Sequence, residues 1–145
     1  MDMHGLEEIL KNTQNFKIRL IVTDGVFSMD GDIAPLREIV DLAKKYNAFT
    51  FVDDCHGAGV LGKLGRGTPE YCGVEGEIDI INSTLGKALG GGTGGYTVAK
   101  QNVVDVLRIA ARPYLYSNSI LPTVVGASLE VFKMLDENTD LVTNL

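Results

Sequence analysis

Apolar positions in the first half of the chain switch between helical and strand-like spacing. Residues 3–14 show the spacing of a short amphipathic helix, and residues 18–23 (IRLIVT) form an apolar, β-branched run of strand length. Pro35 opens a second helix whose apolar positions recur every three or four residues and which ends at Asn47. Residues 48–52 (AFTFV) then predict a second buried strand.

The second half of the chain continues this order of elements. Residues 78–82 and 96–99 predict a third strand and a short fourth one, and residues 103–111 and 122–135 predict helices. Strands without polar alternation, separated by helices, favour a mostly parallel sheet with helices on both faces. No repeat or linker divides the 145 residues. We therefore expect one α/β unit.

Polar side chains gather just after the predicted strands. Those with reactive or hydrogen-bonding groups are Asp24, Ser28, Asp53, His56, Ser83, Thr84 and Lys87. Ligands of parallel sheets bind at the carboxyl ends of the strands, so these residues predict one crevice built by three loops. Loops are polar in any fold, however, and an ordinary surface stays open as an alternative.

Composition excludes several classes of function. A net charge of −6 and a pI near 4.8 argue against nucleic acid, whose phosphates require clustered cations. No apolar run reaches the roughly 20 residues of a membrane span, and the first residues do not have the pattern of a signal peptide. Cys55 and Cys72 are too few for a disulfide scaffold, so we expect free thiols in a cytoplasmic protein.

The common nucleotide and metal motifs fail on their context. Residues 57–62 match G-x-G-x-x-G, but the glycines and proline of residues 65–69 prevent the helix that this fingerprint requires. A second match, residues 90–95, leads into a strand instead of a helix. Cys55-His56 has no further Cys or His nearby, so we predict no metal site and a buried, structural Cys55.

The segment around Lys87 has an unusual composition. Residues 83–91 read Ser-Thr-Leu-Gly-Lys-Ala-Leu-Gly-Gly, which places one lysine among small and apolar residues. Desolvation favours the neutral amine, which attacks carbonyl carbons. The glycines allow a bulky ligand to approach the backbone, and Ser83, Thr84 and the loop N–H groups suit an anion such as phosphate. A glycine-rich turn with an incidental lysine is the alternative.

Several motifs in order resemble one family. Residues 83–91, preceded by Val52-Asp53-Asp54-Cys55-His56, are similar to the α-oxoamine synthases, fold-type-I pyridoxal-phosphate enzymes that condense an amino acid with an acyl-CoA. The likeness runs over residues 18–135 and includes residues 23–31 (TDGVFSMDG) and 112–119 (RPYLYSNS). It implies that residues 1–145 are a central portion of the large, cofactor-binding domain, without the N-terminal and C-terminal parts of that domain.

The resemblance implies a role for each matching residue. Lys87 matches the lysine that holds pyridoxal 5′-phosphate as a Schiff base and, once glycine displaces it, takes a proton from the α-carbon of glycine. Asp53 matches the carboxylate beside the pyridine nitrogen, where an anion keeps the ring protonated. His56 and Ser28 match residues beside the 3′-oxygen and ring of the cofactor, and Thr84 matches a phosphate contact.

Two further matches imply a shared site. Ser117 and Asn118 match phosphate contacts that the neighbouring subunit supplies, so the resemblance implies a homodimer. The family places a phosphate-binding glycine turn and a ring-stacking histidine upstream of this region, and an arginine for the substrate carboxylate downstream. Since none of these is found here, we expect the isolated chain to be poorly active or inactive.

A few positions bear on the substrates. The Asp53-Asp54-x-His56 form and the Ser117-Asn118-Ser119 triplet favour members that condense glycine with acetyl-CoA to 2-amino-3-oxobutyrate and CoA, a step in threonine degradation. Members that make 8-amino-7-oxononanoate are one alternative. A catalytically inactive fragment that keeps only a dimerisation or scaffold surface is another. The expected location is the cytoplasm, or the mitochondrion in a eukaryote, with no nucleic acid or membrane partner.

Overall fold

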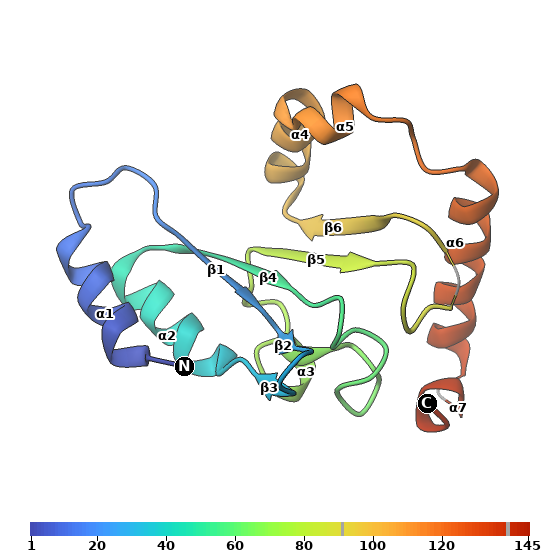
Figure 1. The fold of residues 1–145 in the computed structure, drawn as a ribbon, viewed down its shortest axis with the longest axis horizontal. Coiled ribbons are helices and arrows are strands. Elements are labelled where there is room, and N and C mark those ends of the chain that lie inside the picture. Colours follow the sequence, from blue (N-terminus) through green and yellow to red (C-terminus); the bar gives the residue numbers. More distant parts are fainter. Residues whose placement is uncertain (91, 139) are drawn as a thin grey trace.

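A four-stranded sheet forms the centre of the computed structural model, which describes residues 1–90, 92–138 and 140–145 (Figure 1). Its order is β1–β4–β5–β6, and the strands are β1 (Leu20–Asp24), β4 (Phe49–Asp53), β5 (Ile80–Thr84) and β6 (Gly95–Ala99). The first three are parallel, and β6 runs antiparallel to β5. The predicted α/β fold with a mostly parallel sheet is confirmed.

The longer elements lie where the apolar pattern predicts them. The helices are α1 (Met3–Asn12), α2 (Leu36–Tyr46), α3 (Thr68–Tyr71), α4 (Gln101–Ala110), α5 (Arg112–Tyr116), α6 (Pro122–Glu137) and α7 (Asp140–Thr143), and a hairpin joins β2 (Val26–Phe27) to β3 (Asp32–Ile33). The pattern predicts neither the hairpin nor α3, α5 and α7, because elements this short show no periodicity. None of the described helices is long and apolar enough to cross a membrane.

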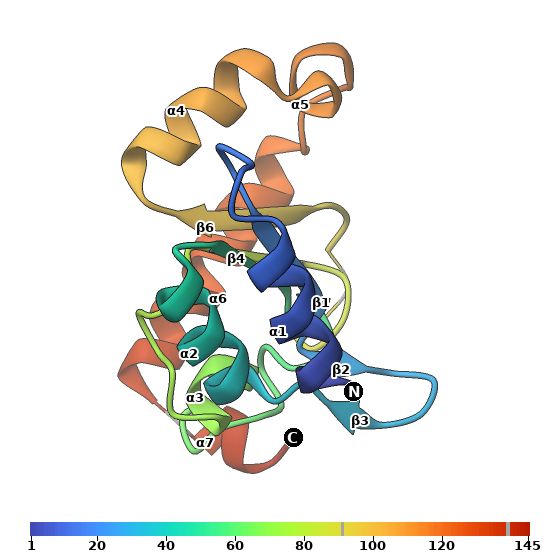
Figure 2. The same ribbon diagram turned by 90° about the vertical axis from the view of Figure 1, so that its left-hand side faces the viewer.

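The apolar core lies between α1, α2 and one face of β1 and β4, and Figure 2 shows the two helices side by side. Its buried members are Leu10, Ile21, Ala34, Leu36, Ile39, Val40, Ala43, Val52 and Val74. Burying one such Leu, Ile or Val side chain contributes about 1.5–3 kcal/mol, so this cluster accounts for most of the packing in the first half of the chain.

Capping residues set the helix ends. The side chain of Asp2 accepts a hydrogen bond of 2.8 Å from the backbone of Gly5 and so begins α1. Asn47 ends α2 in the left-handed conformation (φ 51°), where its N–H bonds the carbonyl of Lys44. The predicted helix end at Asn47 is therefore confirmed.

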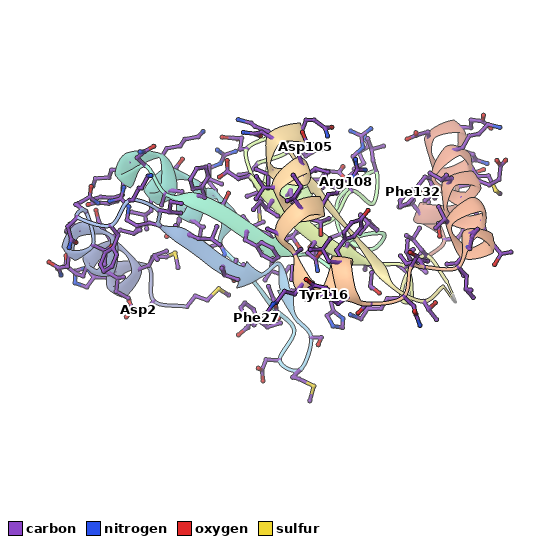
Figure 3. The ribbon with its side chains drawn as sticks, turned by 90° about the horizontal axis from the view of Figure 1, so that it is seen from above. Asp2, Phe27, Asp105, Arg108, Tyr116 and Phe132 are labelled. Atoms are coloured by element: carbon purple, nitrogen blue, oxygen red, sulfur yellow. The ribbon has the colours of Figure 1, made fainter. Side chains whose placement is uncertain are left out.

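The other face of the sheet is open over β1 and β4. Leu20, Val22 and Phe49 alternate with the core positions and are 47%, 63% and 49% exposed. The C-terminal helices contribute no buried residue. Phe132 of α6, labelled in Figure 3, makes an edge-to-face contact with Tyr96 of β6, with ring centroids 5.6 Å apart. The apolar core therefore lies on the α1–α2 side of the sheet.

The third strand begins two residues later than its apolar run predicts. Asp79 accepts hydrogen bonds from the backbone and hydroxyl of Thr50, at 2.9 and 3.1 Å, and its own N–H donates back to that hydroxyl at 3.0 Å. These bonds occupy the backbone of Asp79, and pairing with β4 starts at Ile80. At its other end, β5 extends to Thr84, which pairs with Gly95 of β6 and lies three residues before Lys87.

The contact between α1 and α2 includes a charged carboxylate, Glu7, whose contribution to stability depends on pH. Glu7 accepts hydrogen bonds from Lys45 and Tyr46 of α2, at 2.7 and 2.8 Å, and these two bonds lower the pKa of Glu7 from 4.5 to about 2. Because the folded pKa is lowered, the stabilisation is present above about 4.5 and is lost as the pH falls through about 2. Glu7→Gln should therefore lower the melting temperature at neutral pH, and the difference from the unsubstituted protein should shrink on acidification.

Glu8→Gln is the matched control for this experiment. Glu8 pairs with Lys11 on its own helix, at 2.7 Å, and does not bridge to α2. Thermal unfolding followed by circular dichroism should show the smaller effect for Glu8→Gln. Equal effects of the two substitutions would contradict a role of Glu7 in holding the helices together.

Candidate active site

Three loops meet at the carboxyl edge of the parallel strands, as the sequence predicts. Asp24, Asp53 and Asn82 are neighbours across β1, β4 and β5, because they pair in register. The backbone of Gly25 donates to the carbonyl of Asp53 at 2.7 Å, and Asp54 donates to the carbonyl of Asn82 at 2.8 Å. These bonds continue the sheet by one residue and fix where each loop departs.

Asp53 and Lys87 come together through Cys55. The Lys87 Nζ lies 2.8 Å from the Cys55 Sγ, and the backbone N–H of Cys55 donates to the Asp53 Oδ1 at 3.1 Å. Asn82 is the register partner of Asp53 on β5 and so lies beside it. A carboxylate and a primary amine, contributed by the loops after two neighbouring strands, are thus held at one place.

Opposing effects set the charge of this cluster. Burial acts to raise the pKa of Asp53, but hydrogen bonds from Cys55 and Asn82, with the charge of Lys87, lower it overall. Burial raises the pKa of the Cys55 thiol, and its bond to Asp53 adds to that rise. At neutral pH, Asp53 is therefore an anion and Cys55 a neutral thiol.

The adjacent carboxylate, Asp54, has a different environment. It is 1% exposed, and its two oxygens accept hydrogen bonds from the backbone of Thr68, at 3.0 Å, and from the Thr68 hydroxyl. A Cβ on Gly25 or Gly67 would lie 2.4 or 1.9 Å from an Asp54 oxygen, so glycine is required for this close approach. Burial raises the pKa of Asp54, and the bonds from Thr68 offset part of the rise.

The loop that carries Lys87 is closed by its own backbone. Leu85 donates to the carbonyl of Gly94 at 3.0 Å, and Gly92 donates to the carbonyl of Leu85 at 3.1 Å. The Thr84 hydroxyl donates to the Gly94 carbonyl at 3.1 Å and accepts from the Gly86 N–H at 3.2 Å. Because a hydroxyl has a single proton to donate, the donor of Thr84 is used inside the loop.

The surroundings of Lys87 differ from those that its sequence neighbours suggest. Small and apolar neighbours predict a desolvated amine, whereas Lys87 is exposed in this structure. The apolar side chain beside it, Leu85, is itself buried at 6% exposure and does not cover the lysine. Gly91, the last residue of the sequence motif, lies outside the described residues.

The remaining predicted site residues are dispersed. Ser28 is exposed in the turn between β2 and β3, and His56 is half-buried in the turn after Asp54. Ser117 and Asn118 are exposed after α5, which both Figure 1 and Figure 2 show on the other side of β6 from the Lys87 loop. Within the described part of this chain, the geometry therefore groups Asp53 with Lys87 but does not group Ser117 or Asn118 with them.

A cavity of about 330 Å³ lies between the Lys87 loop and α6. Its lining includes Cys55, Thr84, Ala88, Leu89, Tyr96 and Phe132. The cavity borders the Cys55 side of the cluster, and its walls there are mainly apolar.

Two residues of this cluster are missing from the sequence-based prediction. The sequence predicts a buried, structural Cys55, yet the structure places its thiol beside Lys87 and its backbone N–H on Asp53. Cys55 lies in the turn after β4, where strand alternation no longer applies, so its spacing from Asp53 does not reveal these contacts. Asn82 reaches Asp53 through strand register, which the sequence does not reveal.

The residues present fit pyridoxal phosphate in their chemistry. An anionic carboxylate suits a protonated ring nitrogen, and an accessible amine suits an aldehyde carbon. Asp53 and Lys87 supply these two groups on adjacent loops. The Thr84 hydroxyl, which is engaged within the loop, is available to a phosphate only as an acceptor unless its bond to Gly94 opens.

Comparisons with known proteins agree with this chemistry. The aminotransferase class I and II family matches residues 1–144. A mouse protein, the mitochondrial 2-amino-3-ketobutyrate coenzyme A ligase of Mus musculus, is 51% identical over 145 residues, which are 100% of this chain and 35% of that protein. An 8-amino-7-oxononanoate synthase from Thermosipho melanesiensis is 49% identical over 144 residues, 99% of this chain and 37% of that protein.

A solved structure supports the fold. The structure of SPT with PLP as an internal aldimine matches 92% of this chain, with a TM-score of 0.84 and 37% sequence identity. The match covers 33% of that chain. The fold expected from the resemblance, that of a fold-type-I pyridoxal-phosphate enzyme, is therefore confirmed, and this chain spans about a third of the length of the proteins it matches.

Substitutions of Asp54 test whether its buried bonds hold the site loops. Asp54→Ala should lower the free energy of unfolding by about 1–3 kcal/mol for each Thr68 group left without its acceptor. Asp54→Asn retains one oxygen acceptor and gains a donor for the Thr68 hydroxyl, so its loss should be smaller. Chemical denaturation measures both variants, and equal losses would show that the bonds to Thr68 do not matter.

The unsubstituted protein and Asp54→Asn also give a pH test. Because burial raises the pKa of Asp54, its protonated form stabilises the fold below the ordinary value of 3.8, and this stability is lost as the pH rises through the folded pKa. Asp54→Asn has no such titration. The stability of the unsubstituted protein should therefore fall relative to that of Asp54→Asn as the pH rises through this range.

Proposed function

This chain belongs to the aminotransferase class I and II family, and we propose that it supplies the cofactor lysine and the ring-nitrogen carboxylate of a pyridoxal-phosphate acyltransferase. The proposed reaction condenses glycine with acetyl-CoA to 2-amino-3-oxobutyrate and CoA, the chemistry that connects threonine degradation to glycine. The observation that carries the proposal is the cluster of Asp53, Cys55 and Lys87 at the carboxyl edge of the sheet. The 51% identity to a 2-amino-3-ketobutyrate coenzyme A ligase supports the choice of substrates.

Asp53 and Lys87 have separate tasks in this reaction. Pyridoxal phosphate, when bound, supplies an electron sink for a carbanion at the α-carbon of the amino acid. Asp53 stays ionised, because its hydrogen bonds and the charge of Lys87 lower its pKa, and it holds the proton on the ring nitrogen. Lys87 binds the cofactor through its amine and, when glycine has displaced it, accepts the proton from the α-carbon.

The other proposed cofactor residues act by position. His56 and Ser28 would lie beside the 3′-oxygen and ring of the cofactor, where a hydrogen-bonding group orients it. Thr84 would contact the phosphate, with the N–H groups of the glycine-rich loop as further donors. Arg66, Arg108 and Arg112 do not correspond to the substrate-carboxylate arginine of the family, so that part of the active site is assigned to none of these three residues.

Two other functions remain as alternatives. A synthase of 8-amino-7-oxononanoate, which uses alanine and a pimeloyl thioester, is favoured by the 49% identity to the Thermosipho melanesiensis protein. A catalytically inactive scaffold is the alternative of another class. We place the protein in the cytoplasm or, in a eukaryote, in the mitochondrion, the compartment named for the mouse relative.

Lys87→Ala tests the cofactor assignment in the full-length protein. The unsubstituted protein should develop a visible absorbance band with pyridoxal phosphate and release CoA from acetyl-CoA in the presence of glycine. Lys87→Ala should lack the band of the enzyme-bound cofactor and release CoA about 10²–10⁴-fold more slowly, because it removes the proton acceptor. Lys100→Ala, at the start of α4, is the control for loss of a lysine elsewhere.

The outcomes separate the alternatives. A preference for alanine and pimeloyl-CoA over glycine and acetyl-CoA would replace the proposed substrates but keep the cofactor. A band that persists unchanged in Lys87→Ala would refute the assignment of the lysine. Absence of both band and CoA release in the unsubstituted protein would favour the scaffold.

A second prediction tests the homodimer with shared sites. Consider a mixed dimer of one Lys87→Ala subunit and one Ser117→Asp subunit. If Ser117 contacts the phosphate of the neighbouring subunit, one site of this dimer combines Lys87 of the Ser117→Asp subunit with Ser117 of the Lys87→Ala subunit and is intact. Random mixing should then restore about a quarter of the unsubstituted activity, because half of the dimers are mixed and each has one intact site. No recovery, with mixed dimers demonstrated by mass spectrometry, would show that Ser117 serves its own subunit, and a Ser117→Asp dimer that keeps full activity would show that Ser117 serves no site.

A further inference from the structure

Cys55 lies between the two charged groups of the site, Asp53 and Lys87, and the proposed reaction gives it no role. It follows Asp53 by two residues, in the turn after β4. Its Sγ is 2.8 Å from the Lys87 Nζ, and its backbone N–H is 3.1 Å from the Asp53 Oδ1. The residue therefore contacts both groups at once.

The protonation state of the Cys55 thiol decides which atom donates and which accepts in its contact with Lys87. Burial and the bond to Asp53 raise the pKa of Cys55, so the thiol keeps its proton at neutral pH. A neutral thiol has one S–H donor and a sulfur acceptor. The sulfur accepts from the amine of Lys87, and the backbone N–H of Cys55 donates to the Asp53 carboxylate. Cys55 thus links Lys87 to Asp53 through its side chain on one side and its backbone on the other.

Two polar side chains of the same edge of the sheet have other partners. The Thr84 hydroxyl bonds the backbone of Gly94 and Gly86, and both oxygens of Asp54 bond Thr68. The lysine itself is exposed on a loop whose glycines include Gly90 and Gly94 at positive φ. A long lysine stem on such a loop samples many rotamers unless a partner orders it.

We propose that Cys55 is a positioning residue, which holds the Lys87 amine beside Asp53 whenever that amine is not bonded to the cofactor. The cofactor part of this inference rests on the proposed function, but the contact itself does not. The thiol keeps the amine at the carboxyl edge of the sheet, ready for the aldehyde of an incoming cofactor. The backbone N–H of the same residue donates to the Asp53 carboxylate.

Alkylation of the thiol tests the contact in cofactor-free, full-length protein. On a Cys72→Ser background, the rate of modification of Cys55 by iodoacetamide is measured at neutral pH by peptide mass spectrometry. Lys87→Met keeps the length of the side chain but removes the charge that favours the thiolate. We expect alkylation to slow severalfold, up to about tenfold, which corresponds to one pKa unit.

Lys100→Met is the matched control, and it should leave the alkylation rate unchanged. A rate for Lys87→Met that equals or exceeds that of the background protein would overturn the contact between Lys87 and Cys55. This arm of the experiment involves no cofactor, so its result stands even if the proposed function is wrong.

Cofactor attachment tests the positioning role. After pyridoxal phosphate is added to the cofactor-free protein, the rate at which the visible band appears should fall severalfold in Cys55→Ala. Cys55→Ser, which keeps a donor and an acceptor, should recover most of that rate. At saturation, all three proteins should reach the same band height, since Lys87 itself is unchanged.

Equal rates for Cys55→Ala and the unsubstituted protein would overturn the positioning role but leave the proposed function intact. A serine variant as slow as the alanine variant would do the same, because the hydrogen bond at this side chain would then not matter. A band missing from the unsubstituted protein would instead refute the proposed function.

Discussion

The burial of one carboxylate, Asp54, constrains the whole carboxyl edge of the sheet. Its oxygens bind the backbone and hydroxyl of Thr68, and Gly25 and Gly67 approach them too closely for any side chain. The loop after β1, the loop after β4 and the start of α3 therefore meet at a single side chain. Because an unpaired buried carboxylate is costly, separating these loops at Asp54 would cost free energy.

The adjacent residue shows how position sets charge. Asp53 and Asp54 follow the same strand, but consecutive side chains on an extended chain point to opposite sides. Asp54 enters the packed loops, where burial raises its pKa. Asp53 lies on the Lys87 side, where hydrogen bonds outweigh burial and lower its pKa. The buried Asp54 thus fixes the backbone that positions the ionised Asp53.

Much of the sheet could be read from the sequence, because its strands are continuous apolar runs and its main helices have clear periodicity. The first and last residues of these strands and helices were less predictable. The start of β5 depends on Asp79 bonding Thr50, a contact between residues far apart in the chain. The site followed the same rule: the sequence placed Asp53 and Lys87 after neighbouring strands, but it could not show that Cys55 joins them or that the Thr84 hydroxyl is used within its own loop.

The open sheet face has a consequence for what packs on this chain. Leu20, Val22 and Phe49 present apolar surface on β1 and β4, on the face of the sheet opposite α1 and α2. Sheets of parallel strands are covered on both faces, and this chain spans about a third of the length of the proteins it matches. A second layer packed on these three side chains would bury this face and hold β1 and β4 from the side opposite the core.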